Sequence, residues 1–94
     1  ETQRTRFVSL TEAYHGDTIG AVSGGYSEGL HAPFRPLLFP CLKLDPPHVF
    51  RWQQGHTPET AVQLALAQAE EVFSRHGHEI AALIIEPLMQ GAAG

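Results

Sequence analysis

The sequence predicts an α/β fold built from a mostly parallel sheet with flanking helices. A β-prone segment spans residues 6–10, an amphipathic helix starts at Thr57, and an eight-residue, almost wholly apolar run follows at 80–87. A run this short and this apolar is typical of a central parallel strand that is buried on both faces. Strand, helix and strand in succession is the pattern of a parallel sheet whose connections cross over its faces.

Composition limits the class of protein. The 94 residues are 43% hydrophobic and 17% charged, which is typical of one small folded domain. A net charge of −4 argues against nucleic acid or an anionic membrane as a partner. No apolar run reaches the roughly 18 residues of a membrane span. The single cysteine, Cys41, excludes a disulfide framework. These features predict a soluble, cytoplasmic protein.

The first strand is expected at residues 6–10, and the glycine and aspartate of 14–17 favour a turn directly after it. Asp17 or Thr18 can cap a short helix through residue 22. That helix is expected to end at Gly24 and Gly25, because glycine accepts the positive φ of a helix stop.

The middle of the chain carries several prolines and glycines. Residues 26–36 lack any regular period and are predicted to form a surface loop. Residues 36–39 and 41–44 are a strand candidate that Pro40 interrupts, which places the strand at a sheet edge or end. The Asp45-Pro-Pro sequence should terminate it.

The clearest element is a helix that begins at Thr57. Thr57 provides the N-cap hydroxyl, Pro58 occupies the first helical position and Glu59 adds an acid to the first turn. Gly77 ends the helix. The apolar residues at three- and four-residue spacing should form a buried face: Val62, Ala65, Leu66, Ala69, Val72 and Phe73. The opposite side carries Gln63, Gln68, Glu70, Glu71 and Ser74.

The predicted sheet is incomplete. A central parallel strand needs neighbours on both edges and helices on both faces, and this chain supplies about three strands and one strong helix. The sequence also starts at Glu1 without a methionine and stops in a loop-like stretch, Gly91-Ala-Ala-Gly94. We therefore expect the chain to be a fragment of a larger protein.

Several kinds of site have no support in the sequence. The six histidines show neither an HExxH motif nor zinc-type spacing, and His76 and His78 straddle a helix end where imidazole suits the dipole. Ser23 lies in Ala-Val-Ser-Gly-Gly, which departs from the Gly-x-Ser-x-Gly elbow of serine hydrolases. Neither a GxGxxG motif nor a Walker A motif occurs, so no phosphate-binding loop of either kind is predicted.

Two segments are dense in chemically active groups. Residues 14–18 place a phenol, an imidazole, a carboxylate and a hydroxyl directly after a strand, where α/β folds bind ligands. The alternative is an ordinary turn whose aspartate caps a helix. Glu86 ends the apolar run and can project into the same crevice, with Gln90 in the loop beyond; the alternative is a strand-end glutamate that reaches solvent.

These two segments carry a family resemblance. Ala13-Tyr-His-Gly-Asp-Thr-Ile-Gly-Ala-Val-Ser23 and Ile84-Ile-Glu-Pro-Leu-Met-Gln-Gly91 resemble two motifs of the class III pyridoxal-phosphate-dependent aminotransferases. The resemblance covers nearly the whole chain in the right order. It implies that residues 1–94 are part of the large, cofactor-binding domain of a fold-type I transferase. It also implies a homodimer with active sites at the subunit interface and pyridoxal 5'-phosphate as cofactor.

The resemblance also assigns site residues. Tyr14 would pack against the cofactor ring and contact substrate, since a phenol combines a flat apolar face with a polar tip. His15, Gly16 and Asp17 would shape that loop, with Asp17 orienting active-site hydroxyls, and Glu86 and Gln90 would line the pocket. The run Phe34-Arg-Pro-Leu-Leu-Phe39 is most similar to the members that serve biotin biosynthesis. This similarity implies S-adenosylmethionine as amino donor and 8-amino-7-oxononanoate as acceptor.

The chain also departs from the family pattern. The cofactor lysine, the acid that pairs with the pyridine nitrogen and the Gly-Ser phosphate loop lie outside it, and Lys43 lacks the motif of the cofactor lysine. Residues 22–25 are one residue shorter than is usual in the family. We therefore expect the isolated chain to be inactive. Two alternatives stay open: another class III ω-amino-acid or ornithine-type transaminase, and a non-catalytic α/β module derived from this fold.

Overall fold

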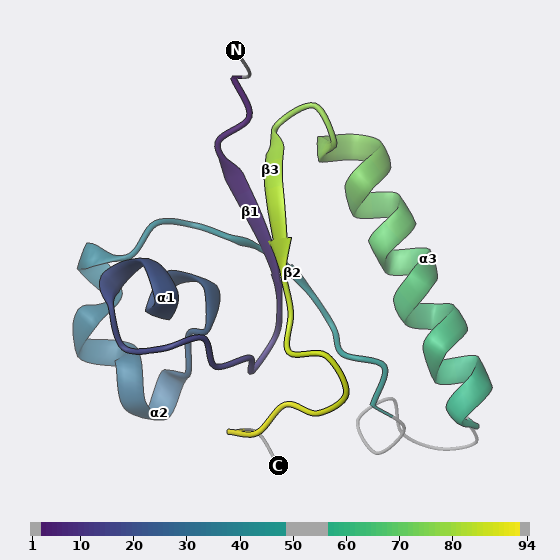
Figure 1. Ribbon diagram of the computed structural model, residues 1–94, viewed down its shortest axis with the longest axis horizontal. Coiled ribbons are helices and arrows are strands. Elements are labelled where there is room, and N and C mark those ends of the chain that lie inside the picture. The colour runs from purple at the N-terminus through teal and green to yellow at the C-terminus, as the bar shows by residue number, and fades with distance from the viewer. Residues whose placement is uncertain (1–2, 49–56, 93–94) are drawn as a thin grey trace.

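A parallel sheet lies between helices on both of its faces in the computed structural model, which describes residues 3–48 and 57–92 (Figure 1). In chain order the elements are β1 (Arg6–Leu10), α1 (Ile19–Gly24), α2 (Glu28–His31), the 3-10 helix η1 (Ala32–Leu37), β2 (Leu42–Leu44), α3 (Pro58–His76) and β3 (Ile80–Ile84). The strand order is β2-β1-β3, and both pairs are parallel. The predicted α/β class and the parallel sheet are confirmed. None of the described helices is long and apolar enough to cross a membrane.

The hydrophobic core lies between the sheet and α3. Val8 of β1 is fully buried and packs with Leu44 of β2 and Ile80 of β3. Four partly buried residues surround this cluster, namely Leu10, Leu42, Ala69 and Val72. Because side chains alternate along a strand, the neighbours Phe7 and Ser9 point to the opposite face, toward α1.

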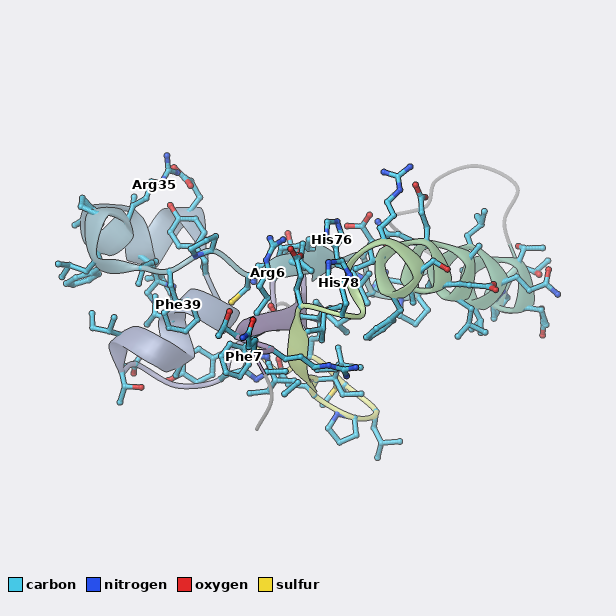
Figure 2. The ribbon with its side chains drawn as sticks, turned by 90° about the horizontal axis from the view of Figure 1, so that it is seen from above. Arg6, Phe7, Arg35, Phe39, His76 and His78 are labelled. Carbon is cyan, nitrogen blue, oxygen red and sulfur yellow. The ribbon has the colours of Figure 1, made fainter. Side chains whose placement is uncertain are left out.

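Polar contacts hold α1 on that second face. The Ser9 hydroxyl is fully buried and donates to the carbonyl oxygen of Gly24 at 2.7 Å. The Lys43 amine donates to Ser9 Oγ at 2.8 Å and also to the Gly24 carbonyl. The rings of Phe7 and Phe39 lie 6.0 Å apart on the same side (Figure 2). These contacts hold the end of α1 against β1 and β2.

The strand at 80–84 is parallel as predicted, but the prediction of a central, doubly buried strand is wrong for this chain. The central strand is β1, and β3 lies at an edge. Leu83 and Ile84 are 44% and 41% exposed. Among the described residues no further strand pairs with β3, so its outer edge and much of its side-chain surface stay uncovered.

Helix α3 starts as predicted, and its predicted apolar face is buried only in part, since Ala69 and Val72 pack against the core. Thr57 Oγ1 accepts from the backbone N–H of Thr60 at 3.3 Å, and Pro58 is the first helical residue. Only Ala61 is fully buried. Leu66 is 63% exposed, Val62 is 44% exposed and Phe73 is 37% exposed. Gln68, expected on the solvent side, contacts Asp45. The narrow sheet covers only part of the apolar stripe, so the rest of that stripe is exposed.

Two short helices occupy the segment predicted to be a loop. Residues 28–31 form α2 and residues 32–37 form η1, in which Pro33 lies at the first turn. Helices of four and six residues are too short to leave a periodic pattern, and the fixed φ of proline suits a helix start. The strand predicted at 36–39 is wrong for the same reason, because Pro36 and Leu37 belong to η1. The edge position predicted for 41–44 is confirmed by β2.

The short helix after the Tyr14 turn is confirmed as α1, and its N-cap is Thr18 rather than Asp17. The expected positive φ at its end is wrong, because Gly25 has a φ of −113°. Glycine is required there by crowding: a Cβ would lie 2.7 Å from the Ala13 carbonyl oxygen and 2.9 Å from the His15 nitrogen. The positive φ instead falls at Gly16, at 121°, inside the turn.

We expect Gly25→Ala to lower the free energy of unfolding by about 1–3 kcal/mol, the usual cost of forcing atoms into packed space. The new methyl group would press on backbone atoms of the loop that carries Tyr14, which have little freedom to move away. Gly20→Ala in α1 is the matched control, since nothing lies within 4 Å of its Cβ position. Chemical denaturation of the protein expressed from its complete gene measures both changes. Equal stability of the two variants would contradict this account.

Candidate functional site

The loops that follow the three strands meet at one edge of the sheet, as expected for the carboxyl ends of parallel strands. The backbone N–H of Thr11, just after β1, donates to the carbonyl oxygen of Leu44 at 2.8 Å. The Gln90 side-chain amide, from the loop after β3, donates to the Thr11 carbonyl oxygen at 3.0 Å. Residues distant in sequence are therefore held side by side at the carboxyl ends of β1, β2 and β3 (Figure 1).

Glu86 joins the two loops that sequence analysis selected. Its Oε1 accepts from the backbone N–H of Tyr14 at 2.9 Å, and its Oε2 accepts from the N–H of Gly91 at 2.9 Å. Both hydrogen bonds favour the ionised form and, helped by nearby His15, they hold the pKa of Glu86 below its ordinary value of 4.5. Glu86 is thus an anionic clamp between the loops, and the alternative of a strand-end side chain reaching freely into solvent is wrong.

Tyr14 presents an aromatic ring whose tip is held. The residue is 41% exposed, and its hydroxyl donates to Asp17 Oδ2 at 2.9 Å. This hydrogen bond and the negative charge of Asp17 raise the pKa of the phenol above 10.0. The hydrogen bond to Asp17 therefore favours the protonated phenol. The positive φ of Gly16 makes the tight turn that returns Asp17 to the ring.

The predicted site residues do not all surround one cavity. Glu86 and Gln90 line a cavity of about 430 Å³ that also includes Leu10 and Pro46. Tyr14 lines a second cavity of about 200 Å³. His15 lines a separate apolar cavity beside Phe7 and Phe39, and its buried Nε2 has no hydrogen-bond partner among the described residues. Glu86 links the first two cavities through its bond to the Tyr14 backbone.

His31 is the residue that sequence analysis missed as part of this site. Its ring, carried by α2, is buried, and it lines the cavity that contains Tyr14. Its Nε2 lies 4.0 Å from Asp17 Oδ1. The sequence offered no signal for it, because its segment reads as an irregular loop and the contact spans 14 residues of chain.

No metal centre is found in the part of the chain that the structure describes: residues 3–48 and 57–92 contain no group of three or more histidine, cysteine, aspartate or glutamate side chains that could bind one. His76 lies at the end of α3 as predicted, where its Nδ1 is 3.1 Å from Glu79 Oε2. His56 lies outside the described residues.

The carboxyl-edge loops of an open parallel sheet are where α/β enzymes bind their ligands. The family model for class-III aminotransferases matches residues 1–94, and the chain belongs to this family. The chain is 45% identical over 93 residues to the adenosylmethionine-8-amino-7-oxononanoate aminotransferase of Geobacter sulfurreducens, covering 98% of this chain and 20% of that protein. It is 43% identical to the enzyme of the same name from Nitratidesulfovibrio vulgaris, covering 100% of this chain and 17% of that protein.

Solved structures of aminotransferases superpose well on this chain. The crystal structure of adenosylmethionine-8-amino-7-oxononanoate aminotransferase from Methanocaldococcus jannaschii superposes with a TM-score of 0.76 at 34% identity, over 100% of this chain and 18% of that one. The PMP-bound form of an aminotransferase from Vibrio fluvialis gives 0.80 at 29% identity, over 93% and 20%. The chain thus spans about a fifth of the length of the proteins it matches.

Lys43 is the only lysine of the chain, and its surroundings argue against a covalent role. Its amine is engaged by Ser9 and Gly24 between β1 and α1, and burial lowers its pKa. We expect borohydride reduction of the complete protein with pyridoxal phosphate to leave Lys43 unmodified. Mass spectrometry of the peptides measures this directly. A pyridoxyl group on Lys43 would show that sequence analysis dismissed this lysine wrongly.

Proposed function

We propose that the protein containing this chain is a pyridoxal-phosphate-dependent aminotransferase that transfers an amino group from S-adenosylmethionine to 8-amino-7-oxononanoate, a step of biotin biosynthesis. The observation that carries the proposal is the 45% identity, over 98% of the chain, to a relative with that name. Residues 1–94 would form part of its large, cofactor-binding domain. No feature of the described residues favours a different reaction.

The residues at the carboxyl edge suit the cofactor. A pyridine ring needs a flat apolar partner, and Tyr14 offers an exposed ring whose hydroxyl is tied to Asp17. His15 and Gly16 lie in the same turn, and Gly16 gives the backbone its positive φ there. Glu86 accepts from the Tyr14 backbone of this turn, and Gln90 donates to the carbonyl oxygen of Thr11, just before the turn. These six residues are therefore proposed as the chain's contribution to the cofactor and substrate site.

Four of these residues then have a specific task. Tyr14 binds the ring face, and Asp17 fixes the direction of the phenol by accepting its hydrogen bond. Glu86 stays ionised and preserves the spacing of the two loops, while Gln90 adds a second link through Thr11. When bound, pyridoxal phosphate supplies the aldehyde that accepts the amino group and the ring that acts as an electron sink. This chain's residues orient the cofactor and leave its covalent attachment to a lysine elsewhere.

The family resemblance also predicts a homodimer with active sites at the subunit interface, small-molecule substrates and a cytoplasmic location. The acidic net charge of −4 agrees with a protein that binds neither nucleic acid nor anionic membranes. Sedimentation of the complete protein measures the oligomeric state. These properties stay predictions.

The decisive experiment incubates the protein from the complete gene with pyridoxal phosphate, S-adenosylmethionine and 8-amino-7-oxononanoate. We expect mass spectrometry to detect the diamino product, 7,8-diaminononanoate, only when all three are present. Turnover with ornithine or another ω-amino acid, and none with S-adenosylmethionine, would assign the alternative transaminase class. Absence of transamination with every donor would favour a non-catalytic protein. The purified 94-residue chain is expected to be inactive in the same assay.

A further inference from the structure

We propose that His31 is a positioning residue, which holds Asp17 and through it the Tyr14 phenol in the orientation that the cofactor site requires. The catalytic consequence rests on the proposed function, whereas the contacts themselves involve only these three side chains. They come from the turn after β1 and from α2. His31 itself is not a catalytic residue, because Asp17 lies between it and the phenol.

The first step is the protonation pattern of the imidazole. The backbone N–H of Ser27 donates to His31 Nδ1 at 3.0 Å, so Nδ1 acts as an acceptor and carries no proton. In the neutral ring the proton then lies on Nε2. The hydrogen bond from Ser27 therefore fixes both the tautomer and the direction of the ring, and leaves Nε2–H as a donor.

The second step is the acceptor that this donor faces. Nε2 lies 4.0 Å from Asp17 Oδ1, while the other carboxylate oxygen of Asp17 accepts the Tyr14 hydroxyl at 2.9 Å. The two oxygens of one carboxylate are thus divided between an imidazole and a phenol. A separation of 4.0 Å is longer than a hydrogen bond, so the contact between Nε2–H and the carboxylate is an electrostatic one.

The third step is the contrast in burial. The side chain of Asp17 is 78% exposed, whereas that of His31 is only 8% exposed. An exposed carboxylate on a turn samples many orientations, and a buried imidazole is fixed by its surroundings. His31 and Tyr14 also line the same cavity of about 200 Å³. The buried His31 ring is therefore the rigid member of this series of contacts, and it restrains Asp17, which in turn restrains the Tyr14 phenol.

Two substitutions distinguish the roles of the two ring nitrogens of His31. His31→Asn retains an acceptor near the Nδ1 position for Ser27 but loses the group that faces Asp17. His31→Gln retains an amide N–H near the Nε2 position but loses the Ser27 contact. Both variants are made in the protein from the complete gene, alone and combined with Asp17→Ala. An intact melting transition confirms that each variant is folded.

The first measurement needs neither cofactor nor substrate. N-acetylimidazole acetylates free phenols, and peptide mass spectrometry gives the rates at Tyr14 and Tyr26, the two tyrosines of this chain. We expect His31→Asn to accelerate acetylation of Tyr14 about tenfold, the factor that corresponds to a hydrogen bond to a charged group. His31→Gln should stay within about threefold of wild type. Tyr26, whose hydroxyl donates to Glu28 of α2 and whose ring lies 6.3 Å from that of His31, reports any local loosening of α2 itself.

The second measurement is steady-state kinetics. We expect His31→Asn to lower kcat/KM about tenfold and to have no further effect when Asp17→Ala is already present, because both changes break the same chain of contacts. Three results would each overturn the proposal. The first is equal acceleration of acetylation at Tyr14 and Tyr26, and the second is impaired activity of His31→Gln with normal activity of His31→Asn. The third is a fold loss of kcat/KM in the double variant with Asp17→Ala that equals the product of the two single losses. A wild-type protein inactive on both substrates would overturn the proposed function alone, since the acetylation pattern is independent of it.

Discussion

Replacing Glu86 with alanine is expected to lower kcat/KM of the complete protein in the proposed reaction about a hundredfold, the cost of shifting reacting groups by about 1 Å. The carboxylate accepts from the Tyr14 and Gly91 backbone nitrogens at 2.9 Å each, so it joins the loops after β1 and β3. Without it both N–H groups lose their acceptor, and only the bond from Gln90 to Thr11 still links the two loops. Steady-state kinetics with both substrates measures the loss.

Glu86→Gln refines this prediction. An amide has one carbonyl oxygen, so it can replace one of the two acceptors, and we expect a loss of about tenfold. Glu79→Ala is the matched control at the other end of β3, where Glu79 pairs with Arg6 at 3.1 Å and contacts His76. That contact lies far from the carboxyl-edge loops, so activity should stay at the wild-type level. Wild-type kinetics for Glu86→Ala would show that the clamp is unimportant for activity.

Replacing Tyr14 with alanine should weaken binding of pyridoxal phosphate about tenfold to a hundredfold. Stacking of a base on an aromatic side chain contributes about 1–3 kcal/mol, and alanine removes the whole ring face. The ring is 41% exposed at the carboxyl edge, so it is available to a ligand. Equilibrium dialysis of the complete protein measures the dissociation constant.

Tyr14→Phe is the matched control for the ring face. It retains the aromatic surface and loses only the hydroxyl that donates to Asp17 at 2.9 Å. We expect cofactor affinity within about threefold of wild type and a separate loss in kcat, because the phenol is no longer held at its tip. If alanine and phenylalanine variants bind the cofactor equally well, Tyr14 does not contribute its ring face to binding.

Sequence patterns predicted the secondary structure correctly where the determining residues lie close together in the chain. The start of α3 follows from the hydroxyl of Thr57 and the fixed φ of Pro58, which act within one turn. The strand at residues 6–10 follows from its apolar, β-prone composition. The two site segments could be selected because their residues match family motifs, and because parallel strands bring their carboxyl ends together.

Local rules failed where the outcome depends on what covers a segment. The apolar run of β3 and the apolar stripe of α3 predict burial, yet Leu83 and Leu66 are 44% and 63% exposed. Burial requires a neighbouring element, and the described residues supply a sheet of only three strands. The short helices α2 and η1 were missed because four and six residues leave too little periodicity to detect.

The sequence by itself therefore determined the α/β class, the parallel direction of the strands and the family, and it predicts Tyr14, Asp17, Glu86 and Gln90 as site residues. Only the tertiary structure decided what those residues contact. The bond from the Tyr14 backbone to Glu86 spans 72 residues, and the approach of His31 to Asp17 joins a helix to a turn. Such contacts depend on the relative placement of whole elements, which no short stretch of sequence specifies.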